Sequence, residues 1–395
     1  MIDQIKNIAA NIAEEVISHR RHLHQHPELS FQEFETSKYI QNVLDKHHIE
    51  YKIGYVKTGI VAIIEGKNPT SKVIALRGDM DALPIQEDTG LDFASVNEGI
   101  MHACGHDMHT SSLLGCAIIL NQLKGQFEGT VKCIFQPGEE LLPGGAKLMI
   151  EEGVLDNPKV EKIFGQHVYP ELQVGQVGFR SGMYMASADE IYITVTGKGG
   201  HGALPHKIID PILISSHLLI ALQQVVSRMA NPGTPSVLSF GFIEGKGATN
   251  VIPNEVKLKG TFRTFDEVWR KEAHIKITEI TENLVKSMGG TVDLDIRVGY
   301  PFLTNHQETT ERAKKVAQDY LGAENVLDLD LRMTAEDFAY FSQAAHGCFY
   351  RLGTSNDAEN INGGLHHPQL LLDDEALRFS TGLMAAMAIA ELKVR

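Results

Sequence analysis

The stretch Val73-Ile74-Ala75-Leu76-Arg77-Gly78-Asp79-Met80-Asp81 decides the fold. Four successive apolar residues are typical of a strand that is buried on both faces, as the strands of a parallel sheet are. Residues 131–135 and 163–164 are similar apolar runs, with a helical pattern at residues 112–123 between them. Polar residues follow all three runs, namely Asp79 and Asp81, Glu139 and Glu140, and His167. The sequence therefore predicts an open α/β sheet with its chemistry at the carboxyl ends of the strands.

Both ends of the chain are predicted to be helical. Residues 5–50 have apolar positions every three or four residues, with Pro27 as the main interruption. Residues 373–394 form a second helical stretch, and its acidic start suits the N-terminus of a helix.

The pattern changes near residue 186. Apolar and polar residues alternate in several segments, which predicts half-buried antiparallel strands. The resulting β-α-β-β-α-β order predicts an inserted α+β domain with a four-stranded sheet. The predicted strands are 189–197, 236–242, 256–262 and 292–296, and the predicted helices are 210–229 and 266–288. We expect a catalytic domain of residues 1–185 plus 299–395 and an inserted domain of residues 186–298.

The composition is typical of a two-domain globular protein. A chain of 395 residues exceeds the size at which one hydrophobic core stops growing. The net charge of −14 argues against nucleic acid as a partner, because phosphate binding needs clustered Lys and Arg. Polar residues interrupt the most apolar helical stretch, residues 212–226, so we expect no membrane partner. We see no signal peptide, and four cysteines without paired spacing fit a reducing cytoplasm.

Residues 102–109 contain five potential metal ligands, which are three His, one Cys and one Asp. Thiolate, imidazole and carboxylate groups bind zinc-like divalent ions. Structural zinc sites usually contain C-x-x-C pairs, and this sequence has none. A dense cluster with further His and Glu far along the chain indicates a catalytic site, so the residues favour a metal-dependent hydrolase.

A series of motifs extends along the chain: Leu76-Arg77-Gly78-Asp79-Met80-Asp81-Ala82-Leu83-Pro84, His102-Ala103-Cys104-Gly105-His106-Asp107, Pro137-Gly138-Glu139-Glu140, Gly199-Gly200-His201-Gly202 and Leu365-His366-His367-Pro368. Together they closely resemble the M20 metallopeptidase family, in particular its amidohydrolase branch of aminoacylases, hippurate hydrolases and auxin-conjugate hydrolases. The resemblance implies a mixed-sheet, metal-dependent exopeptidase-like catalytic domain. It also implies that the inserted domain is a lid or dimerisation domain.

The resemblance implies a divalent metal centre, with two ions of Zn, Mn, Ni or Co. A thiolate can bridge two ions, while imidazoles and a carboxylate fill the outer positions and leave a place for water. Between His366 and the adjacent His367, the family pattern favours His366. The implied ligands are Cys104, His106, Glu140, His167 and His366.

Glu139 and Glu140 are adjacent, so they cannot both reach one metal with equal ease. A metal-bound carboxylate is a poor base, whereas an unligated one in a half-dry pocket can have a raised pKa. The resemblance assigns the general base to Glu139 and the ligand to Glu140, with swapped roles as the alternative. Asp81 and Asp107 are expected to support the ligands from behind. For Asp107 the alternative is a cap for the helix beginning near Thr110.

Further histidines have competing interpretations. His109, like Asp107, is expected either to support the ligands from behind or to cap the helix beginning near Thr110. The N-terminal group lies on a helical pattern before Pro27 and is interpreted as packing rather than as a ligand set; it consists of His19, His22, His24 and His26.

Three residues of the inserted domain are expected to act on the substrate. In the wider clan the residue matching His201 reaches the active site, often from the other subunit, and stabilises the oxyanion. Its alternative is a surface histidine. Asn250 and Arg263 match positions that hold polar groups of the substrate, such as its carboxylate. A cross-strand salt bridge is the alternative for Arg263.

The predicted activity is hydrolysis of N-acyl amino acids, such as acetyl or benzoyl derivatives. Metal-activated water attacks the amide carbonyl with Glu139 as general base, and lid closure excludes solvent. The resemblance also implies a homodimer through the lid. Alternatives within the family are an N-acetyl-diaminopimelate deacetylase and a dipeptidase. The alternative from another class is a non-catalytic protein that binds metal or peptide.

Overall fold

The computed structural model describes residues 1–356 and 364–392. The chain forms two compact units, and each has a hydrophobic core of its own. The first unit consists of Met1–Tyr184, Thr304–Asp330 and Asp337–Arg395, and the second of Met185–Leu303 and Leu331–Glu336. Two short strands, β7 (Gly182–Met185) and β14 (Leu303–Asn305), pair in the segments that connect the units.

The first unit is built on a sheet of eight strands in the order β1-β2-β4-β3-β5-β16-β6-β15. The neighbours β4, β3, β5 and β16 are parallel, whereas the pairs β1–β2, β2–β4 and β16–β6 are antiparallel. The predicted mixed sheet is thereby confirmed. The strands are β1 (Glu50–Tyr55), β2 (Gly59–Glu65), β3 (Val73–Asp79), β4 (Thr130–Gln136), β5 (Lys162–Gln173), β6 (Val177–Phe179), β15 (Val326–Asp328) and β16 (His346–Ser355).

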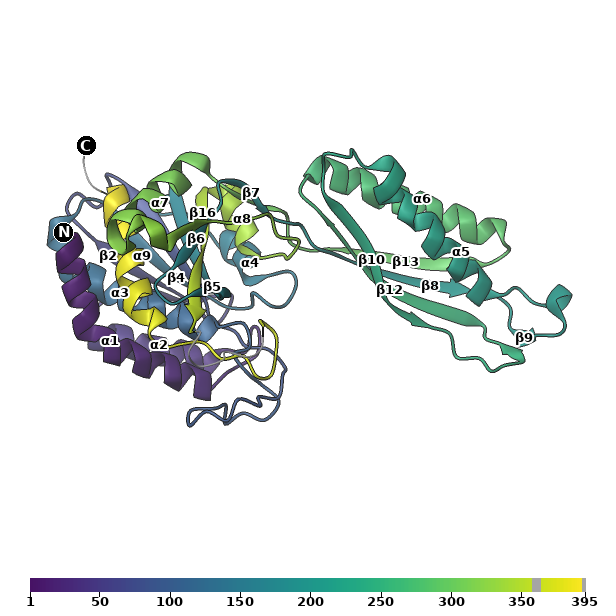
Figure 1. The fold of residues 1–395 in the computed structure, drawn as a ribbon, viewed down its shortest axis with the longest axis horizontal. Helices are drawn as coiled ribbons and strands as arrows, with labels where there is room; N and C mark the ends of the chain where they lie inside the picture. The colour runs from purple at the N-terminus through teal and green to yellow at the C-terminus, as the bar shows by residue number, and fades with distance from the viewer. Residues whose placement is uncertain (357–363, 393–395) are drawn as a thin grey trace. The chain divides into compact units, whose positions relative to one another are not determined.

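Helices cover this sheet on both sides (Figure 1). Helices α1, α2, α3, α7 and α9 share one core with the sheet. Helices α4 and α8 pack on each other, α4 against β4 and α8 against β5 and β16. The helices are α1 (Ile2–Gln25), α2 (Phe34–Lys46), α3 (His106–Leu123), α4 (Gly145–Glu151), α7 (Gln307–Leu321), α8 (Phe338–Ala344) and α9 (Ala376–Leu392).

The N-terminal region is not helical throughout residues 5–50. Helix α1 ends at Gln25, and a loop through Pro27 leads to α2. Phe31 has a φ of +64° in this loop, a conformation that an α-helix does not contain. The closing helix α9 begins at Ala376 rather than at residue 373, and residue 394 of the predicted helix lies outside the described residues.

The arrangement of β4, β3 and β5 determines where the chemistry lies. Strands β3 and β4 are buried over their whole length, as their apolar runs predicted. Because the three strands are parallel neighbours, their carboxyl ends meet at one edge of the sheet. Helix α3 begins beside this edge at His106, after Gly105 with a φ of +79°. It is buried on nearly all sides, which makes it the central helix of the unit.

The second unit follows the chain order β8-α5-β10-β12-α6-β13. Its four-stranded sheet is antiparallel, in the order β10-β12-β8-β13, and both helices lie on one face of it (Figure 1). A separate pair of short strands joins β9 to β11. The elements are β8 (Asp189–Thr196), β9 (Gly200–His201), α5 (Pro211–Gln224), β10 (Ser236–Glu244), β11 (Val251–Ile252), β12 (Glu255–Thr264), α6 (Glu267–Ser287) and β13 (Thr291–Val298).

Helix α5 continues into a π-helical turn, so that Pro211–Met229 is long and apolar enough to cross a membrane by length and composition alone. One such helix is weak evidence for a membrane span. Ile214, Leu218 and Leu222 of α5 belong to the core of the second unit, which accounts for one apolar side of the helix. Its other side is exposed, and Ile220 is 74% accessible.

Candidate metal centre

The five predicted ligands converge at the carboxyl edge of the eight-stranded sheet. Cys104, His106 and His167 offer ligand atoms that all lie within 4.8 Å of one another. The same is true of Cys104, Glu140 and His366. The Cys104 thiol therefore belongs to both groups, and its Sγ lies 3.4 Å from Nε2 of His167. Cys104 is thus within reach of the ligands of both groups, as a thiolate that bridges two ions must be.

His106 has one ring nitrogen that the protein leaves for another ligand. Its Nδ1 lies 3.2 Å from Oδ1 of Asp81. Its Nε2 is buried and has no hydrogen-bond partner among residues 1–356 and 364–392. Buried polar atoms are nearly always hydrogen-bonded, and a metal-binding imidazole usually has its second nitrogen held by a carboxylate. The imidazole of His106 therefore fits a metal ion at Nε2.

Asp81 also supports the turn that carries Glu140. Its Oδ2 accepts hydrogen bonds from the Ser30 hydroxyl, at 2.6 Å, and from the Glu140 N–H, at 3.0 Å. One carboxylate thus holds the His106 ring and the Glu140 backbone at the same time, as expected of a group behind the ligands.

His167 is held in a tautomer that suits metal binding. Its Nδ1 donates to the Val168 carbonyl oxygen at 2.8 Å, which leaves Nε2 facing Cys104. Burial and the charge of Arg351 lower the pKa of His167 well below its ordinary value. The imidazole is therefore neutral, as a metal ligand must be.

The site is rich in negative charge. Burial, together with the carboxylates of Glu140 and Glu139, raises the pKa of the Cys104 thiol well above its ordinary value. Burial lowers the pKa of His106, but Asp79, Asp81 and Glu140 outweigh this effect and raise it to about 10. The carboxylates of Asp79 and Glu140 contribute to both shifts. Such a site favours a divalent cation, beside which the thiol ionises.

Glu139 lies in a turn that only glycine allows. It is buried, and its Oε1 is 3.4 Å from the Asp337 N–H. The preceding Gly138 has a φ of +64°, and a Cβ there would lie 2.3 Å from the Phe31 ring. The Gly138 N–H donates to Oε1 of Glu33 at 2.9 Å. The loop between α1 and α2 therefore fixes the turn that presents Glu139.

Residues that the sequence analysis did not single out lie beneath the ligands. The fully buried guanidinium of Arg77 donates to Asp79 at 2.6 Å, to Asp337 at 2.8 Å and to Gln136 at 2.8 Å. Glu33 was missed as well. A charged Arg in the middle of an apolar strand was a usable signal, because a buried charge needs partners.

Asp107 lies behind the start of α3 and faces α1. Its Oδ2 accepts hydrogen bonds from Arg20 Nε and from the imidazole of His24, each at 2.9 Å. The alternative that Asp107 or His109 caps a helix near Thr110 is wrong, because α3 already begins at His106. His109 instead bonds to Asp79 and to the backbone of β5.

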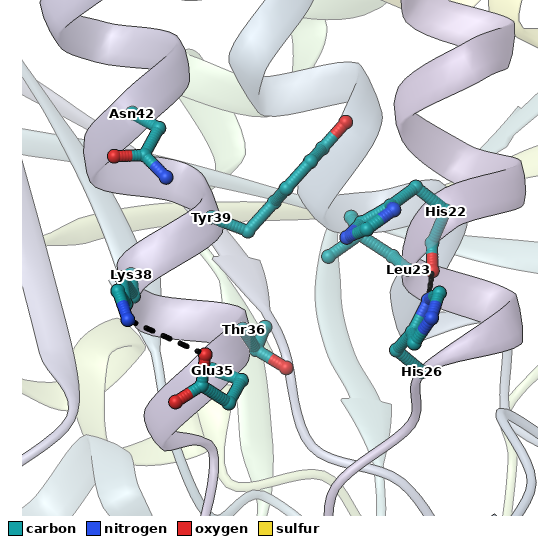
Figure 2. A pocket seen from close by; sticks show the side chains of 8 residues that line it. All are labelled: His22, Leu23, His26, Glu35, Thr36, Lys38, Tyr39 and Asn42. Atoms are coloured by element: carbon teal, nitrogen blue, oxygen red, sulfur yellow. Dashed lines mark hydrogen bonds and ion pairs between the residues drawn. The ribbon is translucent and has the colours of Figure 1, made fainter.

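The N-terminal histidines form packing contacts in the described structure. His24 bonds to Asp107, and His22 stacks between Tyr39 and His26 with ring centroids 3.9 and 4.5 Å apart. These three rings, labelled in Figure 2, line a cavity of about 340 Å³ between α1 and α2.

The remaining predicted residues, His201, Asn250 and Arg263, belong to the second unit. His201 is exposed on β9 and pairs with β11, and Gly202 donates to the Asn250 carbonyl at 2.9 Å. Arg263 lies on β12, where it bonds to the Thr261 hydroxyl and the Met333 carbonyl. It forms no ion pair with any residue of the described ranges. The approach of these residues to a substrate stays a prediction.

Comparisons with known proteins identify the family of this chain. A family model described as Peptidase family M20/M25/M40 matches residues 75–390. The N-acetyl-L-cysteine deacetylase of Bacillus subtilis (strain 168) is 39% identical over 368 residues, which cover 93% of this chain and 86% of that protein. The N-acyl-L-amino acid amidohydrolase of Geobacillus stearothermophilus is 41% identical over 311 residues, covering 78% and 83%.

A solved structure extends the likeness to three dimensions. The crystal structure of a dinuclear metal-binding peptidase of the M20 family from Bacillus subtilis has a TM-score of 0.81 and 35% identity. The match covers 97% of this chain and 99% of that chain. With a family model over most of its length and relatives near 40% identity, the chain belongs to peptidase family M20, in its amidohydrolase branch, and is a hydrolase.

Proposed function

We propose that this enzyme is a metal-dependent amidohydrolase that cleaves the amide bond of N-acyl amino acids, with acetyl or benzoyl as the acyl group. The products are a carboxylic acid and a free amino acid. The observation that carries the proposal is the Cys104 thiol shared by two ligand groups, with Glu139 beside them. The names of the relatives, an N-acetyl-L-cysteine deacetylase and an N-acyl-L-amino acid amidohydrolase, support this class of substrate.

The proposed ligands are Cys104, His106, Glu140, His167 and His366, and they would hold two divalent ions. Sulfur, nitrogen and oxygen ligands together suit Zn²⁺, Co²⁺, Ni²⁺ or Mn²⁺. When bound, the ions would polarise the acyl carbonyl and make a water molecule more acidic.

Glu139 is the proposed general base. It accepts a proton from the attacking water and passes the proton to the leaving amine, so that the C–N bond breaks and a neutral amine departs. Its carboxylate lies in the same group of potential ligands as His106 and Glu140, so it is close to the reacting atoms. The turn at Gly138 and the Asp337 N–H keep it in place.

His201 is the proposed donor to the oxyanion. The Ala203 N–H donates to its Nδ1 at 3.1 Å, so the proton of the neutral ring resides on Nε2. A histidine with Nε2–H free to donate can stabilise the negative oxygen that forms at the carbonyl. Asn250 lies beside His201, and the guanidinium of Arg263 suits the carboxylate of the amino-acid product.

The positions of His201 and Arg263 support a homodimer through the second unit. The Gly197 N–H donates to the Asn254 carbonyl oxygen at 2.8 Å, so the start of β12 lies close to the β9–β11 pair that carries His201. Arg263 is near the opposite end of β12. Arg263 follows Glu255 by eight steps along the extended strand, a span of about 26 Å. That distance is far longer than an N-acyl amino acid. If both residues contact one substrate, they come from different copies of the chain.

The described cysteines are all free and buried. This supports the proposal that the enzyme works in a reducing compartment, the cytoplasm.

The test is turnover of N-acetyl and N-benzoyl amino acids by the metal-stripped enzyme after refilling with each of the four ions. We expect the wild type to regain activity and Glu139→Gln to lose about 10²–10⁴-fold while still binding metal. Glu65→Gln, an exposed carboxylate at the end of β2, is the matched control and should keep full activity. N-acetyl-diaminopimelate and dipeptides in the same panel separate the two alternatives within the family.

Two outcomes would refute the proposal. Metal-restored turnover that survives in Glu139→Gln would remove its role as the base. Metal binding without turnover of any substrate in the panel would favour a non-catalytic binding protein.

A further inference from the structure

The sheet opens beside the metal centre, between β3 and β5. Their pairing runs from Ile74 and Lys162 to Arg77 and Gly165, where it stops. Strand β5 continues beyond this point to Gln173 and still pairs with β16 on its other edge, but the edge that faces β3 has no strand partner where His167 lies. A strand that leaves its neighbour needs other partners for its N–H groups. The N–H groups of β5 that face β3 beyond Gly165 therefore need partners other than β3.

His109 provides that partner. The Val168 N–H donates to Nε2 of His109 at 2.9 Å. This N–H belongs to the peptide bond between His167 and Val168. A side chain from α3 thus accepts the hydrogen bond where the pairing of β3 with β5 has ended.

The other nitrogen of His109 is fixed as well. Its Nδ1 lies 2.5 Å from Oδ1 of Asp79, which can only accept, so Nδ1 carries the proton and Nε2 is the acceptor. Asp79 is itself held by Arg77 at 2.6 Å. All three side chains are completely buried. The ring of His109 is therefore held at both edges.

The contact continues directly to a proposed metal ligand. Nδ1 of His167 donates to the carbonyl oxygen of Val168 at 2.8 Å, and Nε2 of His167 faces Cys104. The rings of His109 and His167 are also in edge-to-face contact, with centroids 4.6 Å apart. The orientation of the His167 ring therefore depends on the position of the His167–Val168 peptide.

We propose that His109 is a positioning residue of the metal centre. It takes the place of β3 as the hydrogen-bond partner of β5 and so holds Nε2 of His167 in position for the metal. The inference rests on the proposed function in one respect, that His167 is a metal ligand. Arg77, Asp79 and His109 together support β5 at the point where its pairing with β3 has ended.

The test measures metal binding directly, without substrate. His109→Phe fills the space of the ring but loses both hydrogen bonds, whereas the amide oxygen of His109→Gln can still accept from Val168. We expect His109→Phe to release Co²⁺ or Zn²⁺ to a chelator about 10–100-fold more readily than the wild type, as removal of groups behind a ligand typically does. His109→Gln should lose less. The Co²⁺ absorption spectrum should change in His109→Phe, because it reports ligand geometry.

His19→Phe is the matched control, because His19 is also a buried imidazole that bonds to one side chain, Tyr39, but it contacts no proposed ligand. It should bind metal as the wild type does. Unchanged metal affinity and spectrum in His109→Phe would overturn the proposal, as would an equal loss in His19→Phe. If His109→Phe does not fold, the order of affinity of wild type, His109→Gln and His109→Asn decides the matter, since Asn is too short to reach Val168. A wild type that binds no metal would instead refute the proposed function.

Discussion

At the scale of single residues, Glu33 is the buried carboxyl group that the turn of Glu139 depends on. Its Oε1 accepts from the N–H groups of Phe31 and Gly138, and its Oε2 accepts from the hydroxyl of Thr58. Burial and the nearby Asp81 raise the pKa of Glu33 to about 7. The folded protein therefore holds a proton on Glu33 at pH values where the unfolded chain has already lost it.

Glu33 should make the metal-free protein less stable as the pH rises. The stabilisation by its proton is complete below the ordinary pKa of 4.5 and is lost as the pH rises to about 7, because the folded state must then bury a charged carboxylate. Relative to Glu33→Gln, the wild type should lose about 2–3 kcal/mol of unfolding free energy between pH 5 and pH 8. Urea unfolding of both proteins at the two pH values measures the difference.

Glu14→Gln is the matched control, since Glu14 is an exposed carboxylate on α1. Its pH profile should follow that of the wild type. Parallel profiles of wild type and Glu33→Gln would contradict the assignment of a raised pKa to Glu33.

The metal ligands could be predicted from the sequence more readily than the residues that support them. Metal chemistry restricts ligands to a few residue types, so Cys104, His106 and His167 could be selected from the sequence. Glu33 was missed and His109 was assigned to a support only as one of two interpretations, because both act through backbone N–H groups, at Gly138 and Val168. Those contacts join segments that lie 105 and 59 residues apart and depend on the packed fold.

At the scale of secondary structure, three helices meet at a glycine. Helix α3 packs against both α1 and α9, and Gly115 lies where the three helices meet. A Cβ at this position would lie 2.5 Å from Cγ2 of Thr381 on α9 and 2.7 Å from Cγ2 of Val16 on α1. The absence of a side chain at Gly115 allows the helices to come this close.

Gly115→Ala should therefore destabilise the protein, although alanine is the better helix former. Overpacking of a tight core typically costs about 1–3 kcal/mol, which exceeds the gain of up to about 1 kcal/mol in helix propensity. Thr381→Ser removes the nearer methyl group and should recover part of the loss. Thermal unfolding of the single and double variants measures both effects.

Gly125→Ala is the control, because nothing lies within 4 Å of a Cβ there. It should change stability by less than about 0.5 kcal/mol. Equal effects at Gly115 and Gly125 would show that the three helices have room to move apart.

The elements that the sequence predicted are those with a strong apolar pattern. The runs in β3 and β4 are buried throughout and were recognised as strands. Strand β1 is mostly exposed and was not predicted, because its sequence Glu-Tyr-Lys-Ile-Gly-Tyr has little apolar alternation. Helices α4 and α8 contain seven residues each, too few to show a period.

At the scale of the whole molecule, His201 can serve the active site of its own chain or that of a second copy in a dimer. The resemblance could assign His201 and Arg263 to the substrate, but the distance between the β9–β11 pair and the far end of β12 only became apparent from the fold of the second unit. Exposed apolar side chains in that unit are most numerous on α5 and the edge strand β10, which pack together. They are Ile212, Leu213, Ile220, Val237, Phe242 and Ile243. This surface is the proposed dimer interface.

Two inactive variants, produced together in one cell, distinguish the two arrangements. A chain with His201→Ala keeps Glu139, and a chain with Glu139→Gln keeps His201. If His201 acts across the dimer, each mixed dimer contains one complete site. Half of the dimers are mixed when the chains associate at random, so we expect about a quarter of the wild-type activity to return.

The interface can be tested in the same experiment. Adding Ile220→Glu on α5 to both chains should abolish the restored activity and yield monomers in sedimentation, because a charge would be buried at the interface. Val268→Glu on α6 is the matched control, since Val268 is 70% exposed and Ile220 is 74% exposed. It should leave the complementation intact. A mixture as inactive as the separate variants, while still dimeric, would show instead that His201 serves its own chain, and Arg263 would then lie too far from His201 to bind the same substrate molecule.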